Sequence, residues 1–419
     1  MPVLLFAISL FISCSESNKP EYVFPDPETT PTVTLSLVDK GHDFVVFTAK
    51  TTYADQCAYM CIESGSATPS VEELFANGTP ISTTQSVELR VDGLAAETAY
   101  QIVTAVADEE KSVHGMSLSF VTASDQPASP YPDGMVVESF EKNFEDGGVA
   151  KGFIAVADLK ANPSLKFYPT HLNPAKTPSS AFEHFKTLNY GTPFILSNGG
   201  YFWEGASLSL CVTDGDVKSI ATQTAYPKVN GEQITAYPVR AALGLHADGS
   251  FEATWVYCIS GKPYSFPSPL DNDERTETYM SNPPTSKTEG AVLWPPQQAI
   301  GGGPMLVFEG ENVAMEYYYR EIMDTGGTAG TSRQPRTAVG GTKDGKVMLL
   351  VCDGRGKNGS NGLTLSEMAD IFVEKGMDYA INLDGGGSST IVGHDGAVMN
   401  NPSDGSERGV PTVVVLSSK

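Results

Sequence analysis

Apolar and polar residues alternate in short runs along the first third of the chain, which is the pattern of half-buried β-strands. The runs cover residues 33–38, 43–48, 86–91, 98–106 and 117–122. Short strands at regular intervals, with turns between them, are typical of two packed β-sheets. The pattern therefore predicts an all-β sandwich over residues 32–123.

The second half of this segment resembles a fibronectin type III domain. Leu94, Thr98 and Tyr100 match the turn into a late strand that carries a tyrosine corner in such domains. The resemblance implies a spacer or docking module that takes no part in the chemistry. Residues 124–132 contain three prolines and predict a linker to the rest of the chain.

Residues 133–419 predict one larger domain in which strands dominate. The apolar, strand-like runs cover residues 152–157, 193–197, 241–245, 337–340, 347–352 and 412–416. A short helix is expected at residues 180–188 and a clearer one at 364–375. We therefore expect the sandwich to be followed by an α+β domain built on a strand-rich, mixed sheet.

The helix predicted at 364–375 links two strands that each end in an acid. Thr364 and Glu367 form a capping-box pattern at its start. Asp353 follows the strand before the helix, and Asp384 follows the strand after it. Because such crossovers usually join parallel neighbouring strands, we expect both acids at the same edge of the sheet.

The charge balance restricts the possible partners. The chain of 419 residues has 27 basic and 50 acidic residues, giving a formal net charge of -23. A nucleic acid would be repelled by this charge and is excluded as a partner. After the first few residues, no apolar run is long enough to span a bilayer.

The beginning of the sequence predicts export from the cell. Residues 3–12 form an apolar core of the kind found in signal peptides. Residues 11–14 resemble the lipobox of bacterial lipoproteins. This resemblance implies a signal peptide at 1–13, lipidation of Cys14, a tether at 14–31, and a cell-envelope location with membrane contact only through the lipid. The alternative is a general secretory signal with an incidental cysteine.

Glycine-rich turns mark a candidate ligand site. The strongest begins at Asp384, after a buried strand. Its next residues are three glycines and three hydroxyl-bearing residues, Gly385, Gly386, Gly387, Ser388, Ser389 and Thr390. Two more turns have backbone that no side chain covers. One contains Gly199 and Gly200, directly after Asn198, and the other contains Gly302 and Gly303. Adjacent glycines suit a backbone with unusual dihedral angles or one that a ligand approaches closely.

Taken together and in this order, these stretches resemble the phosphodiester glycosidase family. The resemblance spans most of the larger domain and is most specific at residues 335–340, 353–355, 363–369 and 382–390. It implies hydrolysis of the bond between a sugar anomeric carbon and a phosphodiester. It does not imply which sugar is cleaved.

The residue types agree with that chemistry. A phosphodiester carries one negative charge, which arginine binds through two parallel hydrogen bonds. Arg336, Arg355 and Arg408 each lie beside a glycine turn or a strand end and are the candidates for this role. Backbone amides of the glycines can bind the remaining oxygens.

Cleavage of a glycosidic bond builds positive charge at the anomeric carbon. A carboxylate stabilises that charge or activates water, and Asp384 and Asp353 are the available acids. Asn198 can hydrogen-bond the sugar or the phosphate. We expect one cleft to be lined by Asn198, Gly302, Arg336, Asp353, Asp384 and Arg408.

Two other functions stay open from the sequence. One is a surface lipoprotein that binds a sugar phosphate or glycan without cleaving it. The other is a metal-dependent phosphodiesterase, which cleaves on the other side of phosphorus. No ligand spacing around Asp353 or Asp384 supports a metal site, and we expect no cofactor.

Overall fold

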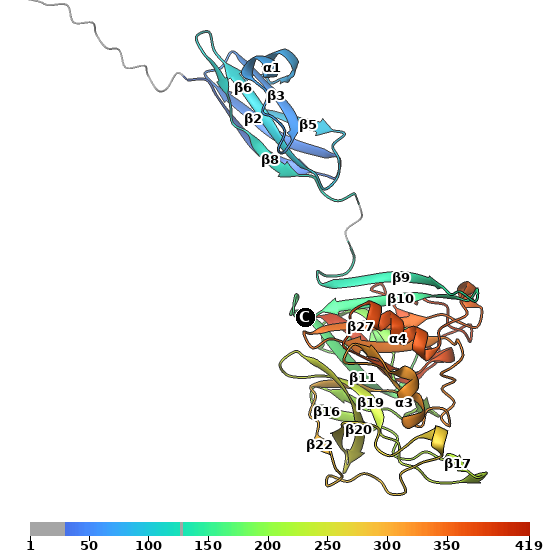
Figure 1. Ribbon diagram of the computed structural model, residues 1–419. Coiled ribbons are helices and arrows are strands. Elements are labelled where there is room, and N and C mark those ends of the chain that lie inside the picture. Colours follow the sequence, from blue (N-terminus) through green and yellow to red (C-terminus); the bar gives the residue numbers. More distant parts are fainter. Residues whose placement is uncertain (1–29, 126–128) are drawn as a thin grey trace, which may run out of the picture. The chain divides into compact units, whose positions relative to one another are not determined.

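The computed structural model describes residues 30–125 and 129–419 (Figure 1). The predicted signal peptide and the lipidation site Cys14 lie outside the described residues. The chain divides into two compact units at residues 128 and 129. Strands dominate both units and helices are few, so the expectation of a strand-rich protein is confirmed. None of the helices in the described ranges is long and apolar enough to cross a membrane.

Within residues 30–125, the first unit has two antiparallel sheets and one short helix, α1 (Val71–Asn77). One sheet contains β1 (Thr32–Lys40), β2 (Phe44–Thr52) and β5 (Val87–Asp92). The other contains β3 (Gln56–Glu63), β4 (Thr79–Pro80), β6 (Ala99–Ala107), β7 (Ser112–His114) and β8 (Leu118–Val121). Val45 and Phe47 of β2 pack in one apolar cluster with Tyr59, Ile102 and Phe120 of the second sheet.

The second unit is built from three larger sheets. The first, which we call the site sheet, has the strand order β25-β24-β28-β26-β27-β10-β9. Its strands are β9 (Met135–Asn143), β10 (Val149–Asp158), β24 (Met305–Phe308), β25 (Glu311–Asn312), β26 (Arg336–Gly341), β27 (Lys346–Cys352) and β28 (Tyr379–Asn382).

Two further sheets and two small ribbons complete this unit. A four-stranded sheet contains β11 (Leu165–Lys176), β30 (Val410–Ser418), β12 (Thr192–Asn198) and β29 (Ile391–Val392). A seven-stranded sheet contains β16 (Asp216–Ser219), β15 (Cys211–Thr213), β23 (Gln298–Gly301), β19 (Arg240–Leu245), β20 (Phe251–Ile259), β21 (Lys262–Phe266) and β22 (Val292–Leu293). The ribbons are β13 (Phe202–Trp203) with β14 (Ala206–Ser207), and β17 (Lys228–Val229) with β18 (Glu232–Gln233).

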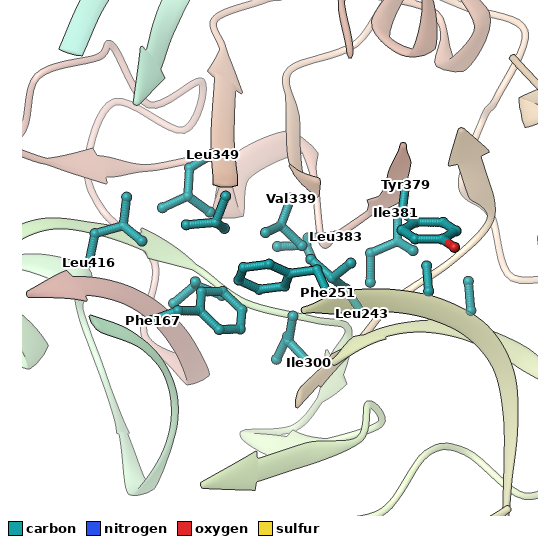
Figure 2. Packing of buried hydrophobic residues seen from close by; sticks show 14 of the residues in the cluster. Phe167, Leu243, Phe251, Ile300, Val339, Leu349, Tyr379, Ile381, Leu383 and Leu416 are labelled. Atoms are coloured by element: carbon teal, nitrogen blue, oxygen red, sulfur yellow. The ribbon is translucent and has the colours of Figure 1, made fainter. Parts of the chain in front are cut away.

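One apolar core joins the three larger sheets (Figure 2). Leu349 and Ile381 come from the site sheet, Leu416 from the four-stranded sheet, and Leu243 and Phe251 from the third. All five side chains are almost completely buried. Burying each one stabilises the fold by roughly 1.5–3 kcal/mol, so the core fixes the three sheets as one body.

The expectation of a mixed sheet is wrong. Every strand pairing among the described residues is antiparallel. The crossover through α4 (Leu365–Glu374) leads from β27 to β28, but β26 lies between these strands and pairs antiparallel with both. The strands β27 and β28 are therefore parallel without being neighbours.

Local capping signals explain the helices of this unit. Thr364 accepts a hydrogen bond from the Glu367 amide, and Glu367 accepts one from the Thr364 amide, so the predicted capping box of α4 is confirmed. The helix expected at 180–188 begins earlier, as α2 (Pro178–Phe185), because Thr177 is the N-cap and proline suits the first helical position. The short helix α3 (Ala314–Arg320) was not predicted.

Candidate active site

The antiparallel register of the site sheet brings several chain segments to one edge. Arg336, the first residue of β26, pairs with Cys352, the last residue of β27. Asn382, the last residue of β28, pairs with Ala338 near the start of β26. The segments that follow β27 and β28 therefore both leave the sheet at the edge where β26 begins.

A cavity of about 410 Å³ opens at this edge. We call it the Asp384 cavity, because Asp384 is the one acidic side chain among its described lining residues. Other predicted residues in its lining are Arg336, Arg355, Gly385, Gly386, Gly387 and Arg408. Asn198, Gly302 and Asp353, which we expected in the same cleft, do not line it.

Asp384 is partly buried and lies at the start of the triple-glycine turn. Burial raises the pKa of its carboxyl from the ordinary 3.8 to about 6, although a hydrogen bond from Ser388 and the nearby charge of Arg408 oppose this rise. The Gly385 amide donates a hydrogen bond to Asp384 Oδ1 at 3.0 Å. A carboxyl group with this pKa is ionised near neutral pH and still basic enough to accept a proton.

Arg355 and Arg408 supply positive charge to the same cavity. The Arg355 Nε donates to Gln334 Oε1 at 3.1 Å, and its Nη1 lies 3.4 Å from Ser403 Oγ. Arg408 lies 3.3 Å from Ser388 Oγ through Nη1 and pairs with Asp404 through Nη2. Both guanidinium groups are exposed or half exposed. They therefore keep donor capacity for an anion in the cavity.

The predicted phosphate-binding role of Arg336 is at odds with its contacts. Its side chain is only 2% exposed and donates to the carbonyl oxygens of four residues. These are Leu363, Thr328, Ala329 and Ser332, at 2.9, 3.0, 2.8 and 2.9 Å. Four of its five N–H donors are thus used by the backbone. Arg336 therefore holds the 328–332 segment in place beside the cavity. It does not have the two free, parallel N–H groups that a phosphate would need.

The expected catalytic role of Asp353 is also at odds with the structure. The residue is only 1% exposed and does not line the cavity. Oδ1 accepts hydrogen bonds from the Asn401 amide at 2.8 Å and from Asn400 Nδ2 at 3.1 Å, and Oδ2 accepts one from Asn401 Nδ2 at 3.3 Å. These donors explain why a buried acid is tolerated here. Asp353 anchors the 400–401 turn.

Asn198 positions the site and does not face a ligand. It is completely buried, and its Nδ2 donates to the backbone oxygen of Asp384 at 2.7 Å. Its Oδ1 accepts from Thr337 Oγ1 at 2.8 Å and from the Thr390 amide at 3.1 Å. Asn198 therefore sets where the backbone of Asp384 lies relative to β26.

The first two glycine turns are needed for packing. A side chain at Gly200 would lie 2.4 Å from Ser209, and one at Gly302 would lie 2.1 Å from the Asn382 carbonyl oxygen. Gly199 and Gly303 are equally crowded, by Thr412 and Glu321. None of these four glycines lines the Asp384 cavity. Their lack of a side chain allows strands to approach each other and is not evidence for ligand-binding amides.

The triple-glycine turn behaves differently. Gly386 has a φ of +61°, which favours glycine, and it lies in the cavity beside Arg355. At Gly387 a side chain would lie 2.2 Å from Arg408 Nη2. Of the three hydroxyls that follow, Ser388 contacts Arg408, whereas the hydroxyls of Ser389 and Thr390 are buried and have no hydrogen-bond partner among the described residues.

Tyr201 and Asn382 are among the cavity residues that the sequence pattern did not single out. Tyr201 donates through its hydroxyl to the Gly303 carbonyl at 2.8 Å and accepts from Asn382 Nδ2. Asn382 Nδ2 also donates to Gly303 at 3.0 Å, while its buried Oδ1 has no partner. The only sequence signal for them was their position, beside the Gly199–Gly200 turn and two residues before Asp384.

No group of three or more His, Cys, Asp or Glu side chains within residues 30–125 and 129–419 could hold a metal ion. The polar groups at the Asp384 cavity include one carboxylate, the guanidinium groups of Arg355 and Arg408, side-chain amides and backbone amides. This set suits a substrate that combines an anionic group with hydroxyl groups.

Comparisons with known proteins place the chain among its relatives. The human N-acetylglucosamine-1-phosphodiester alpha-N-acetylglucosaminidase is 32% identical over 284 residues, which is 66% of this chain and 46% of that protein. The bovine enzyme of the same name is 34% identical over 131 residues, covering 30% of this chain and 24% of that protein. The chain thus spans less than half the length of these relatives.

Among solved structures, the catalytic domain of the zebrafish enzyme of this name, auto-inhibited by its pro-peptide, is 21% identical with a TM-score of 0.46. The match covers 70% of this chain and 87% of that one. The family model described as Phosphodiester glycosidase matches residues 198–417, which is more than half of the chain. This protein therefore belongs to the phosphodiester glycosidase family.

Proposed function

We propose that this protein hydrolyses the bond between a sugar anomeric carbon and a phosphodiester in phosphate-containing glycans. One observation carries the proposal: a single carboxylate with a pKa of about 6 shares a cavity with two arginines that keep donor capacity. A phosphodiester-linked sugar has both an anionic group and a centre that becomes positive during cleavage. Each of these groups has a matching partner in the cavity.

The phosphate binds to Arg355 and Arg408 in this proposal. Both guanidinium groups lie beside the triple-glycine turn, Arg355 next to Gly386 and Arg408 next to Gly387. Glycine allows the phosphate to approach the backbone closely, and the turn amides add donors. Charge-assisted hydrogen bonds of this kind are about twice as strong as neutral ones.

Asp384 acts on the sugar. Its carboxylate accepts a proton from water as the water oxygen bonds to the anomeric carbon. The bond from that carbon to the phosphate oxygen breaks, and its electron pair leaves with the phosphate as a phosphomonoester. Because phosphate is a good leaving group, this step needs no strong general acid, which agrees with a cavity that has one carboxylate.

Asn382 is proposed to select the sugar. Its Nδ2 donors are used by Tyr201 and Gly303, so its orientation is fixed and Oδ1 remains as a buried acceptor. A buried acceptor without a partner costs about 1–3 kcal/mol. A hydroxyl or N–H group of the bound sugar would remove that cost.

Release of sugar from a phosphodiester-linked glycan tests the activity. The wild-type protein should release sugar, and Asp384→Asn should not. A protein that binds the glycan and never releases sugar would instead be a glycan-binding lipoprotein. Hydrolysis in ¹⁸O-labelled water decides which bond breaks, because label in the sugar means carbon–oxygen cleavage. Label in the phosphate would replace this proposal with a phosphodiesterase.

We further propose a fibronectin type III-like sandwich for the first unit and an α+β class for the second. For the first unit, the Tyr100 hydroxyl accepts a hydrogen bond from the Ala95 amide at 3.0 Å, as in a tyrosine corner.

We also propose that the protein is exported and anchored by lipid at Cys14 in the bacterial cell envelope. Cells fed labelled fatty acid should label the wild-type protein, and unchanged labelling of Cys14→Ala would refute the anchor.

A further inference from the structure

A second cavity of about 380 Å³ adjoins the Asp384 cavity. We call it the Trp203 cavity. It shares four lining residues with the Asp384 cavity, Tyr201, Phe202, Gly326 and Thr328. These residues border both spaces, so a bound molecule can extend from one cavity into the other.

Exposed aromatic side chains distinguish the Trp203 cavity. Trp203 is 70% exposed and Tyr226 is 54% exposed, and both contribute to its lining. Leu208 adds a third exposed apolar side chain, whereas none of the described lining residues is acidic. Large apolar side chains gathered at a cavity mouth mark a binding surface, because their exposure to water costs free energy.

The backbone holds Trp203 in place. It belongs to the hairpin β13–β14, where it pairs with Ala206. Glu204 and Gly205 form the two-residue tip with φ values of 48° and 80°, the combination found in tight hairpin turns. The hairpin is closed by a hydrogen bond from the Leu208 amide to the Tyr201 carbonyl at 2.8 Å. Trp203 is thus fixed to the segment of Tyr201 and Phe202, which borders both cavities.

The other groups of the Trp203 cavity are suited to hydroxyls. Thr222, Thr224 and Thr325 contribute hydroxyl-bearing side chains to its lining, and Thr224 Oγ1 donates to the Tyr226 hydroxyl at 3.3 Å, which leaves it as an acceptor. Arg240 also lines this cavity and donates to the carbonyls of Glu321 and Ile322 at 3.2 and 3.1 Å, which leaves further N–H groups. An aromatic face with hydroxyl partners around it matches a pyranose ring, which has an apolar C–H face and a rim of hydroxyls.

We propose that the Trp203 cavity is a subsite for a second, neutral sugar ring on the glycone side of the cleaved bond. This rests on the proposed function. Arg355 and Arg408 line only the Asp384 cavity, and Trp203 and Tyr226 line only the other. With the phosphate on the arginines, the cleaved sugar lies next to the shared residues and its non-reducing side extends towards Trp203. The substrate then carries at least two rings before the phosphate, and the product is an oligosaccharide.

Tryptophan fluorescence tests the subsite without any catalysis. The chain has three tryptophans, all within the described residues, and Trp255 and Trp294 are 1% and 3% exposed. Acrylamide therefore quenches mainly Trp203. Cellobiose, mannobiose and N,N′-diacetylchitobiose serve as neutral probes. At least one of these disaccharides should protect Trp203 from quenching. Tyr226→Ala should weaken this protection by raising the apparent Kd of the disaccharide about tenfold.

Tyr53→Ala is the matched control, because Tyr53 is 57% exposed and belongs to the first unit. It should leave the protection unchanged. A second experiment compares phosphodiester substrates with one or two sugar rings in the glycone and the same aglycone. The wild type should prefer two rings, and Trp203→Ala should lower kcat/KM about tenfold for that substrate only.

The outcomes separate the two proposals. If neither substrate is cleaved but a disaccharide protects Trp203 and Tyr226→Ala weakens this protection, the proposed hydrolysis fails and the subsite stands. If no probe protects Trp203, or if Trp203→Ala affects both substrates equally, the subsite is refuted. A preference that follows the length of the aglycone would refute the glycone-side assignment.

Discussion

The segments after β27 and β28 begin alike and end in different roles. Each carries an acid followed by glycine at the same edge of the site sheet, Asp353 directly after β27 and Asp384 one residue further from the end of β28. Asp353 receives three hydrogen bonds from Asn400 and Asn401 and is closed off from the cavity. Asp384 has few partners and a raised pKa. The number of donors around an acid, more than its place at a strand end, decides whether it supports the fold or is available for chemistry.

The largest expected difference between Asp384 and Asp353 is in the turnover number, kcat. Asp384→Asn keeps the shape and removes the charge, so kcat should fall by about 10²–10⁴-fold. Asp353→Asn should lower kcat per folded molecule far less. Steady-state kinetics with a phosphodiester-linked sugar, corrected for the folded fraction by circular dichroism, makes the measurement. Equal losses in the two variants would remove the distinction between the acids.

For the free energy of unfolding, we expect the larger effect at Asp353 and the smaller one at Asp384. Asp353→Asn loses charge-assisted hydrogen bonds and places an amide N–H₂ among donors, which should cost about 2–3 kcal/mol of unfolding free energy. Urea unfolding monitored by circular dichroism measures this cost. Asp384→Asn at pH 7 serves as the control and should not be destabilised. A stable Asp353→Asn variant would contradict the anchoring role.

The dependence of stability on pH sharpens the contrast. Because the pKa of Asp384 is raised from 3.8 to about 6 in the folded protein, the folded state favours its protonated form. The contribution of the protonated Asp384 carboxyl to the free energy of unfolding is fully present below pH 4. It is lost as the pH rises through 6. Asp384→Asn should therefore have the higher Tm at pH 8, by the equivalent of about 1–3 kcal/mol, and lose this advantage at pH 4. A pH-independent difference would contradict the burial of an ionised group.

The smallest effect concerns the arginines. Arg355→Lys keeps the charge and loses the planar guanidinium, so KM should rise about tenfold with Tm unchanged. Arg336→Lys is the comparison, and it should lower Tm because four backbone carbonyls lose their donor. Differential scanning fluorimetry and kinetics on the same samples separate the two. A KM increase without a loss of Tm in Arg336→Lys would restore Arg336 as a phosphate ligand.

Features set by nearby residues could be predicted from the sequence. The capping box of α4 depends on Thr364 and Glu367, three residues apart, and the strand preceding Asp384 depends on a short apolar run. Roles set by distant segments could not. Arg336 is engaged by a loop that has no pattern of its own, and Asp353 by a turn some 50 residues later. The insertion of β26 between β27 and β28 is likewise invisible in the intervening sequence.

The amide of Asn198 has a consequence for how activity is lost. It joins β12 to β26 and to the segments around Asp384 and Thr390, and so connects the four-stranded sheet to the site sheet. The candidate site cannot open locally without separating two sheets that share one core. Heat inactivation and global unfolding should therefore share one midpoint temperature, and the backbone amide of Thr390 should exchange with deuterium only at the rate of global unfolding.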